Sequence, residues 1–176
     1  MSYKLGNRII IIGNSGSGKT TLSYKLGELL KLPVIHLDKE YWKKGWVKTP
    51  KEEWDEKVRK IISEPEWILD GNFNSTLEIR INRADTVVFL DYNRFLCLLD
   101  VIKRIIKHLG KTRPDMAEGC PEKFDFTFIK WVLWGFPVKS RRNILKCLAK
   151  YNENEQIIIK SRAELKKFLT TLTHTE

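Results

Sequence analysis

Residues 13–20 combine residue types and spacing that point directly to phosphate chemistry. They read Gly-Asn-Ser-Gly-Ser-Gly-Lys-Thr, which matches the pattern G-x-x-x-x-G-K-[ST] without a mismatch. An apolar run precedes this segment and an amphipathic run follows it. In such a loop the main-chain amides and the positive end of the following helix meet at one point, which suits a polyphosphate. We predict that the nucleotide is bound by Gly13, Asn14, Ser15, Gly16, Ser17, Gly18, Lys19, Thr20 and Thr21.

Two side chains within this loop and one outside it can bind the phosphates of a nucleotide or the metal ion that accompanies them. Lys19 is expected to reach the outer phosphates, and the Thr20 hydroxyl is expected to bind Mg²⁺. Asp70 ends an apolar run beside Gly71, where it could hold Mg²⁺ directly or through water. The predicted cofactors are therefore ATP and Mg²⁺, with Thr20 and Asp70 on the metal.

Asp38 stands in "HLDKEYW", at the expected end of another strand. A carboxylate there can accept the proton of an acceptor hydroxyl or orient it, and a turn-forming aspartate is an equally weighted alternative. Tyr41 and Trp42 follow closely, and their rings could stack on a base or sugar or simply pack the loop. We predict that Asp38, Tyr41 and Trp42 bind substrate and that Asp38 and Lys19 are catalytic.

Several arginines are candidates for holding the transferred phosphoryl group. That group needs cations around its equatorial oxygens, and the fork of an arginine suits the geometry. Arg80 and Arg83 follow the third expected strand, Arg104 lies in an amphipathic run, and Arg141 and Arg142 end a long irregular segment. We predict that Arg104, Arg141 and Arg142 are catalytic.

Motifs that are absent from the sequence argue against two classes of P-loop protein. The sequence contains no N-K-x-D, which reads guanine in switch-type GTPases, and "WILDGN" and "VVFLDY" lack the Asp-Glu pair typical of motor ATPases. Without a glutamate to activate water, the chain is better suited to passing a phosphoryl group to a bound acceptor.

Apolar and amphipathic runs alternate along the chain, which predicts a parallel sheet covered by helices on both faces. Two capping boxes are expected, one with Thr49 before Pro50 and one with Ser161. The segment 110–142 interrupts the alternation and predicts an insertion over the site, with a short helix in 126–136. We expect one domain over 1–176, with strands at 8–13, 33–38, 66–71, 85–91 and 155–160 and helices at 20–32, 49–63, 93–109 and 161–172.

The 176 residues carry a formal net charge of +10 and three cysteines. The excess of basic residues suits either nucleotide phosphates or a nucleic-acid surface. The cysteines are far apart and form no C-x-x-C, so neither a zinc ribbon nor a redox pair is indicated. Free thiols and the absence of a secretory or membrane-spanning run predict a cytoplasmic protein.

With these residues in view, the chain resembles the adenylate kinase-like branch of P-loop kinases. Within that branch it is most similar to the bacterial topology modulation protein family, whose members are described as kinases or ATPases. The resemblance rests on four stretches: "GNSGSGKTTL" (13–22), "LDKEYWKKGW" (37–46), "WILDGNFNSTLEIRINRADTVVFLD" (67–91) and "RPDMAEGCPEKFD" (113–125).

The resemblance implies a three-layer α/β/α fold with a five-stranded parallel sheet in the order 2-3-1-4-5. It also implies an acceptor-binding segment at about 38–62 and a lid at about 110–142. By position, Arg80 or Arg83 would grip an acceptor phosphate, and Arg104 with Arg141 or Arg142 would clamp the donor. The segment after "LDG" reads Asn-Phe-Asn instead of Phe-Pro-Arg, which speaks against AMP as the acceptor.

The sequence therefore predicts an ATP- and Mg²⁺-dependent phosphotransferase acting on a small acceptor such as a nucleoside, nucleotide or metabolite. The alternative is a nucleotide-binding regulator associated with DNA, in which binding is the output. No helix-turn-helix, zinc-finger or RNA-binding signature supports a nucleic-acid partner.

Overall fold

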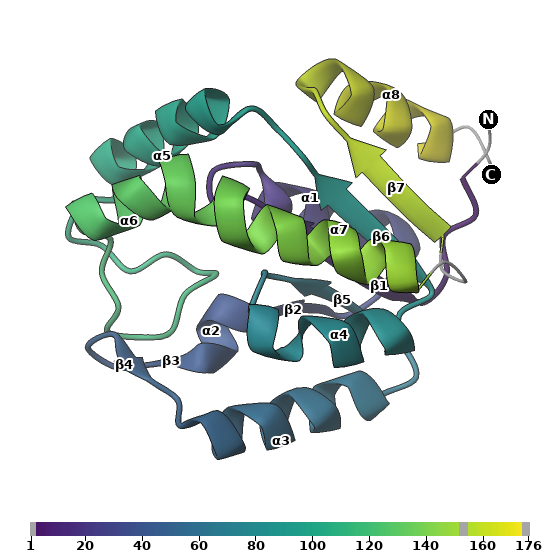
Figure 1. The fold of residues 1–176 in the computed structure, drawn as a ribbon, viewed down its shortest axis with the longest axis horizontal. Coiled ribbons are helices and arrows are strands. Elements are labelled where there is room, and N and C mark those ends of the chain that lie inside the picture. The colour runs from purple at the N-terminus through teal and green to yellow at the C-terminus, as the bar shows by residue number, and fades with distance from the viewer. Residues whose placement is uncertain (1–2, 152–154, 174–176) are drawn as a thin grey trace.

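A parallel sheet of five strands forms the centre of the computed structural model, which describes residues 3–151 and 155–173 (Figure 1). The strand order is β2-β5-β1-β6-β7. Counted along the chain within this sheet, that order is 2-3-1-4-5, which confirms the expected topology. The strands are β1 (Arg8–Gly13), β2 (Val34–His36), β5 (Trp67–Asp70), β6 (Thr86–Leu90) and β7 (Glu155–Ile159).

Helices cover both faces of this sheet, as the continuous apolar strands predict. One face packs against α3 (Lys51–Ser63), α4 (Asn74–Arg83) and α7 (Arg141–Lys150). The other packs against α1 (Lys19–Leu30), α5 (Arg94–His108) and α8 (Arg162–Thr173). The architecture is therefore the three-layer α/β/α fold.

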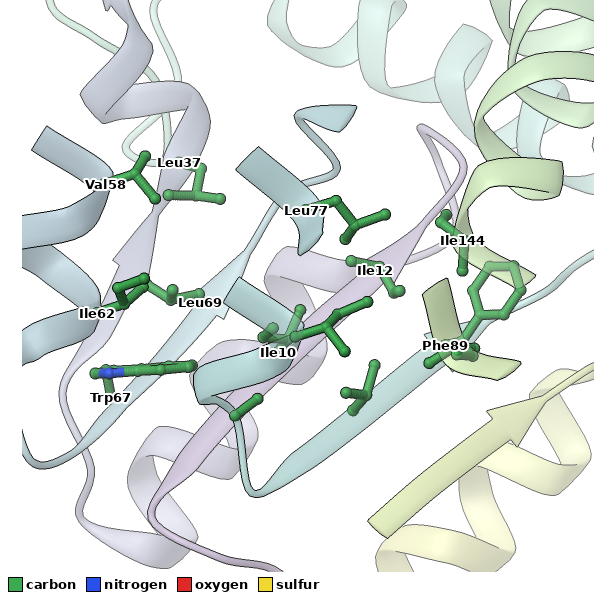
Figure 2. Close-up of a cluster of buried hydrophobic side chains, with 14 of the residues drawn as sticks. Ile10, Ile12, Leu37, Val58, Ile62, Trp67, Leu69, Leu77, Phe89 and Ile144 are labelled. Carbon is green, nitrogen blue, oxygen red and sulfur yellow. The ribbon is translucent and has the colours of Figure 1, made fainter. Parts of the chain in front are cut away.

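Alternate residues of each strand enter the two cores, because successive side chains of a strand point to opposite faces. Ile10 and Ile12 of β1 belong to the first core and meet Leu77 of α4 and Phe89 of β6 (Figure 2). Their neighbours Ile9 and Ile11 belong to the second core. Both cores thus fix the strand β1 that leads into residues 13–20.

The two predicted helix caps have different outcomes. Ser161 caps α8 as expected, its Oγ accepting a hydrogen bond from the amide of Glu164 at 3.2 Å. The prediction for Thr49 is wrong by one residue, because Pro50 is the N-cap of α3. The Thr49 hydroxyl instead donates to the carbonyl of Tyr41, which ties the start of α3 to the preceding segment.

The segment between β2 and α3 contains a short helix and a hairpin that the sequence does not predict. The strand ends at His36, and Asp38 lies in the first turn of the short helix α2 (Leu37–Tyr41) instead of ending the strand. A two-stranded antiparallel hairpin follows, made of β3 (Trp42–Lys43) and β4 (Val47–Lys48).

The expected insertion divides into two parts. Residues 110–125, called here the 110–125 loop, have no helix and lie between α5 and the β3–β4 hairpin. Residues 126–150, called the helical arm, run through α6 (Phe126–Lys130), a π-helix (Trp131–Ser140) and α7. The short helix predicted at 126–136 is therefore the start of a much longer helical segment. In the part of the chain that the structure describes, no helix is long and apolar enough to cross a bilayer.

Candidate functional site

The loop between β1 and α1 has the backbone shape of a phosphate cradle. Gly18 has a φ of 89° and forms the N-cap of α1, and a Cβ on it would meet nothing within 4 Å. Gly16 has a φ of 79°, and a Cβ there would lie 2.2 Å from the carbonyl oxygen of Cys97. Only glycine fits at Gly16, while the space above Gly18 is open. No acidic side chain stands in the first turn of α1 and no side chain caps it, so its amides are available to an anion.

Lys19 and Thr20, at the start of α1, face two different groups. The Lys19 ammonium donates to the carbonyl oxygen of Asn14 at 3.0 Å, across the loop. Burial lowers the pKa of Lys19, and the charges of Asp70 and Asp38 oppose that change. The Thr20 hydroxyl donates to Asp115 Oδ2 at 3.2 Å. Lys19 and Thr20 thus interact with carboxylates from three other segments of the chain.

Asp115 is the main functional candidate that the sequence reading missed. It is 9% exposed and also accepts a hydrogen bond from the guanidinium of Arg113 at 2.9 Å. It lies within the stretch "RPDMAEGCPEKFD", on which the resemblance partly rests. That stretch is the sequence signal that could have pointed to Asp115. Its role depends on a contact across 95 positions of the chain, which no local pattern reveals.

The 110–125 loop is held against the β3–β4 hairpin by hydrogen bonds and a small apolar cluster. Trp46 Nε1 donates to the carbonyl of Pro121 at 3.2 Å, and the amide of Gly45 donates to the carbonyl of Gly119 at 3.0 Å. Met116, Ala117 and Cys120 are buried against Trp42 and Trp46. Trp42 therefore packs the loop, the second of the two roles that the sequence left open.

Asp70 and Asp38 complete the carboxylates near the phosphate loop. Asp70 is buried, accepts from Ser23 Oγ at 3.1 Å and contacts His36 Nδ1 at 3.0 Å. Burial raises the pKa of Asp38, and the charge of Lys19 opposes that rise. Asp38, Asp70 and Asp115 all act on each other or on Lys19 electrostatically, which places them around one region.

These groups fit a divalent cation held together with a nucleotide. Mg²⁺ prefers oxygen ligands and keeps waters and phosphate oxygens in its shell. The Thr20 hydroxyl and the Asp115 carboxylate are adjacent, and Ser23 links Asp70 to the carbonyl of Thr20. Among the described residues no three acidic, histidine or cysteine side chains form a metal site by themselves. The protein groups would therefore supplement the phosphates.

The predicted arginines do not gather around this region as expected. Arg80 is completely buried and donates to the carbonyl oxygens of Gly71 and Phe73, each at 3.1 Å, and to that of Asn72. Burial lowers the pKa of Arg80 to about 9. Arg83 donates to the carbonyl of Ile62 at 3.3 Å. The placement of Arg80 contradicts a grip on an acceptor phosphate, because its buried guanidinium holds backbone carbonyls instead. Arg83 is exposed, and its substrate-binding role stays a prediction.

Of the three arginines expected to be catalytic, Arg104 is the one whose charge acts on Lys19 of the phosphate loop. Its guanidinium pairs with Glu122 at 3.1 Å, lies over the ring of Phe128, and acts electrostatically on Lys19. Arg141 makes a two-pronged pair with Asp91, with both distances 2.8 Å. Arg142 is exposed on α7.

The aromatic residue Tyr41 also has a packing role. Its ring packs edge-on against Trp54, with centroids 5.1 Å apart, and at a tilt against Phe73, with centroids 4.7 Å apart. Tyr41 thus joins α2 to the core of α3.

Two asparagine side chains brace the phosphate loop, Asn72 from outside the loop and Asn14 from within it. Asn72 accepts from the amide of Gly13 at 3.1 Å and donates to the Gly13 carbonyl at 2.8 Å. Asn14 is 1% exposed, and its Nδ2 donates to the carbonyl of Val132 in the helical arm at 2.8 Å. Asn14 was predicted to bind nucleotide, and its side chain is committed to the arm.

A cavity of about 500 Å³ opens beside the loop. Ser17 lines it on one side, Leu165, Lys166 and Leu169 of α8 line it on another, and Tyr92 also borders it. The hydroxyls of Ser17 and Tyr92 are buried and have no hydrogen-bond partner among the described residues. These two hydroxyls therefore lie within the wall of the cavity.

Comparison with solved structures shows which fold this is. Shikimate kinase from Acinetobacter baumannii in complex with shikimate has a TM-score of 0.53 and 19% identity, covering 98% of this chain and 96% of that chain. Shikimate kinase from Bacteroides thetaiotaomicron has a TM-score of 0.51 and 18% identity, covering 94% and 95%. YorR protein from Bacillus subtilis, in complex with phosphorylated GDP, has a TM-score of 0.52 and 18% identity, covering 96% and 98%.

At these identities the likeness shows the fold alone, which is that of the shikimate kinase-like P-loop proteins. No model of a protein family matches the sequence, and no curated protein is similar to it. The nearer resemblance to the topology modulation protein family stays a prediction.

Proposed function

We propose that this protein is a P-loop kinase that transfers the γ-phosphoryl group of ATP to a hydroxyl of a small acceptor. One observation carries the proposal. The open, glycine-shaped turn at 13–18 delivers Lys19 and Thr20 to a region flanked by Asp38, Asp70 and Asp115. A turn that served packing alone would explain neither the open space at Gly18 nor this arrangement of charges.

In this proposal the phosphates lie on the amides of residues 14–20, and the nucleoside lies in the cavity between the loop and α8. Lys19 would leave the Asn14 carbonyl for the outer phosphates, which are stronger acceptors for an ammonium. Ser17 and Tyr92 would border the nucleoside in this cavity. Arg104, near Lys19, is the arginine best placed to approach the transferred group.

Thr20 and Asp115 would bind Mg²⁺ directly. Asp70 would lie outside these direct ligands, linked to Thr20 through Ser23. The metal would neutralise charge that builds up on the phosphates during transfer. Asp38 would accept the proton of the acceptor hydroxyl or orient that hydroxyl, since its carboxylate interacts electrostatically with Lys19. We also propose membership in the topology modulation protein family, on the four stretches named above.

Nucleotide binding is tested by thermal unfolding with ATP and Mg²⁺, because a ligand that binds only the folded state raises the melting temperature. We expect a clear rise for the natural protein and for Lys60→Ala, which removes an exposed lysine from α3. Lys19→Ala should lose most of the rise. A rise that survives in Lys19→Ala would contradict the proposal.

Transfer is tested by ADP release with a panel of nucleosides, nucleotides and sugars, read above the background without acceptor. Transfer to at least one compound is expected. If nothing accepts phosphate while duplex DNA is retained at physiological salt, the DNA-associated alternative would be favoured.

A further inference from the structure

Helix α5, at the periphery of the molecule (Figure 1), exposes a row of large apolar side chains. Its members, spaced alternately four and three residues apart, are Phe95, Leu99, Ile102, Ile106 and the C-cap residue Leu109, called here the α5 stripe. Their exposed fractions run from 36% at Ile102 to 74% at Ile106. Residues three and four apart are neighbours on one face of a helix, so these side chains form one unbroken apolar surface.

Neither the core nor the phosphate loop accounts for the α5 stripe. The inner face of α5 carries the buried residues Cys97, Val101 and Ile105, which belong to the second core. This inner face also lies against the phosphate loop, since a Cβ on Gly16 would meet the carbonyl oxygen of Cys97 and the side chain of Val101. The fold and the proposed site therefore use the inner face and leave the stripe free for a contact with another molecule.

The exposed apolar area is about that of an ordinary protein–protein interface. The five side chains of the α5 stripe leave about 500 Å² exposed, which is high for a monomer. Phe124 and Phe126, 55% and 72% exposed, lie near its C-terminal end, because the amide of Gly110 donates to the carbonyl of Glu122 at 2.9 Å. With these two rings the surface reaches about 750 Å² per chain, close to the roughly 800 Å² that each partner buries in a standard interface.

The spacing of the α5 stripe favours a second copy of this chain as the partner. Alternation of four and three is the spacing at which two α-helices interlock their side chains. The spacing reads almost the same from either end, with Ile102 at the centre, so two stripes can match in antiparallel orientation. A parallel pair would bring together the basic ends of both helices, with Lys103 and Lys107. An antiparallel pair separates these charges and sets the two helix dipoles against each other.

We propose that the protein forms a two-fold symmetric dimer in which the α5 stripes of two copies pack in antiparallel orientation. Ile102 lies near the two-fold axis and faces its own copy, and Phe95 faces Leu109 of the partner subunit. The assembly ends at two copies, because the same surface serves both partners. This inference goes beyond the proposed kinase function and does not depend on it.

Sedimentation equilibrium tests whether the dimer exists. We expect twice the mass of one chain at about 100 µM, with a dissociation constant of about 10 µM or tighter. Ile106→Glu should weaken the dimer by about 100-fold or more, because it places a charge in an apolar contact. Val47→Glu, a change at a 57% exposed apolar position of β4, is the matched control and should leave the dimer intact. A monomeric natural protein, or a dimer as strong in Ile106→Glu, would overturn the inference. Binding of a monomeric natural protein to phosphatidylglycerol vesicles, lost in Ile106→Glu, would assign the stripe to lipid instead.

Cross-linking tests the orientation of the two helices. Under mild oxidation Ile102→Cys should form a disulfide between subunits, since this position faces its own copy. Phe95→Cys should form none, because its counterpart lies at the far end of the partner helix. The natural protein is the control for its own thiols, of which Cys97 and Cys120 are buried. Equal cross-linking of both variants would show parallel helices, and cross-linking of neither would show that the stripes do not meet; either result contradicts the proposed dimer.

Discussion

The Nδ2 atom of Asn14 donates a hydrogen bond of 2.8 Å to the carbonyl oxygen of Val132, in the π-helix of the arm. In a π-helix that carbonyl pairs with the amide five residues later, and here that residue is Pro137, which has no N–H. The carbonyl of Leu133, which an α-helix would pair with residue 137, accepts instead from Arg94 at 3.2 Å. The carbonyls of Val132 and Leu133, the two possible helical partners of an N–H at residue 137, thus both accept from side chains outside the arm.

This arrangement predicts that Asn14 couples the phosphate loop to the helical arm. Asn14→Ala leaves the buried Val132 carbonyl without its donor, so we expect the free energy of unfolding to fall by about 1–3 kcal/mol. The affinity for ATP should fall as well, because the loop loses its brace. Urea unfolding and titration with ATP and Mg²⁺ measure the two effects. Asn143→Ala, a half-buried change on α7, is the control and should alter neither. Unchanged stability in Asn14→Ala would show that this hydrogen bond does not hold the loop.

Arg80 is predicted to stabilise the fold and not to bind substrate. Arg80→Ala leaves the carbonyl oxygens of residues 71–73 without a donor, and the expected loss is about 3 kcal/mol or more of unfolding free energy. Arg83→Ala loses one hydrogen bond at an exposed position and should cost less than about 1 kcal/mol. Chemical unfolding of both variants decides between the roles. A residue that gripped the acceptor would instead raise KM and leave stability nearly unchanged.

The His36–Asp70 contact predicts a pH-dependent contribution to stability. Burial opposes protonation of His36, but its hydrogen bond to Asp70 and the charge of Asp70 outweigh burial, so its pKa is raised above 6.5. A raised pKa in the folded state means that the added stability is complete below about pH 6.5 and is lost as pH rises through the folded pKa. The stability advantage of the natural protein over His36→Asn should therefore shrink between pH 6.5 and 8.5, measured by urea unfolding. His108→Asn, whose ring makes no ion pair among the described residues, should follow the natural protein. An advantage that grows with pH would contradict the raised pKa.

The strands and the phosphate loop could be predicted because their signals are local. Ile9 to Ile12 form an unbroken apolar run, and the glycines of the following loop stand at fixed spacing. The strand order came from the resemblance and agrees with the structure.

The parts that were missed depend on distant contacts. Arg80 and Arg83 stand at similar places in the sequence relative to the third strand, and nothing local shows that the first turns inward to backbone. The sequence does not predict α4, because its polar start, "NFNST", resembles a loop. The Val132 carbonyl, which finds no N–H at Pro137, accepts from Asn14, a residue more than a hundred positions away. The partner of the Thr20 hydroxyl likewise comes from the 110–125 loop, whose path no local pattern fixes.

Asp115 is predicted to be a ligand of the divalent cation that accompanies ATP. Asp115→Asn keeps an oxygen that can accept from Thr20 but removes the negative charge, so the affinity for the cation should fall by about 10-fold or more. Electron paramagnetic resonance of Mn²⁺, with a non-hydrolysable ATP analogue, measures this without relying on transfer. Binding of the analogue in EDTA should stay equal or become tighter, because one carboxylate near the phosphates is gone. Glu118→Gln removes a carboxylate from the same loop at an exposed position and should leave Mn²⁺ binding as it is in the natural protein. If Asp115→Asn binds Mn²⁺ as the natural protein does, the aspartate only positions Thr20, and the metal is held by Thr20 and the phosphates.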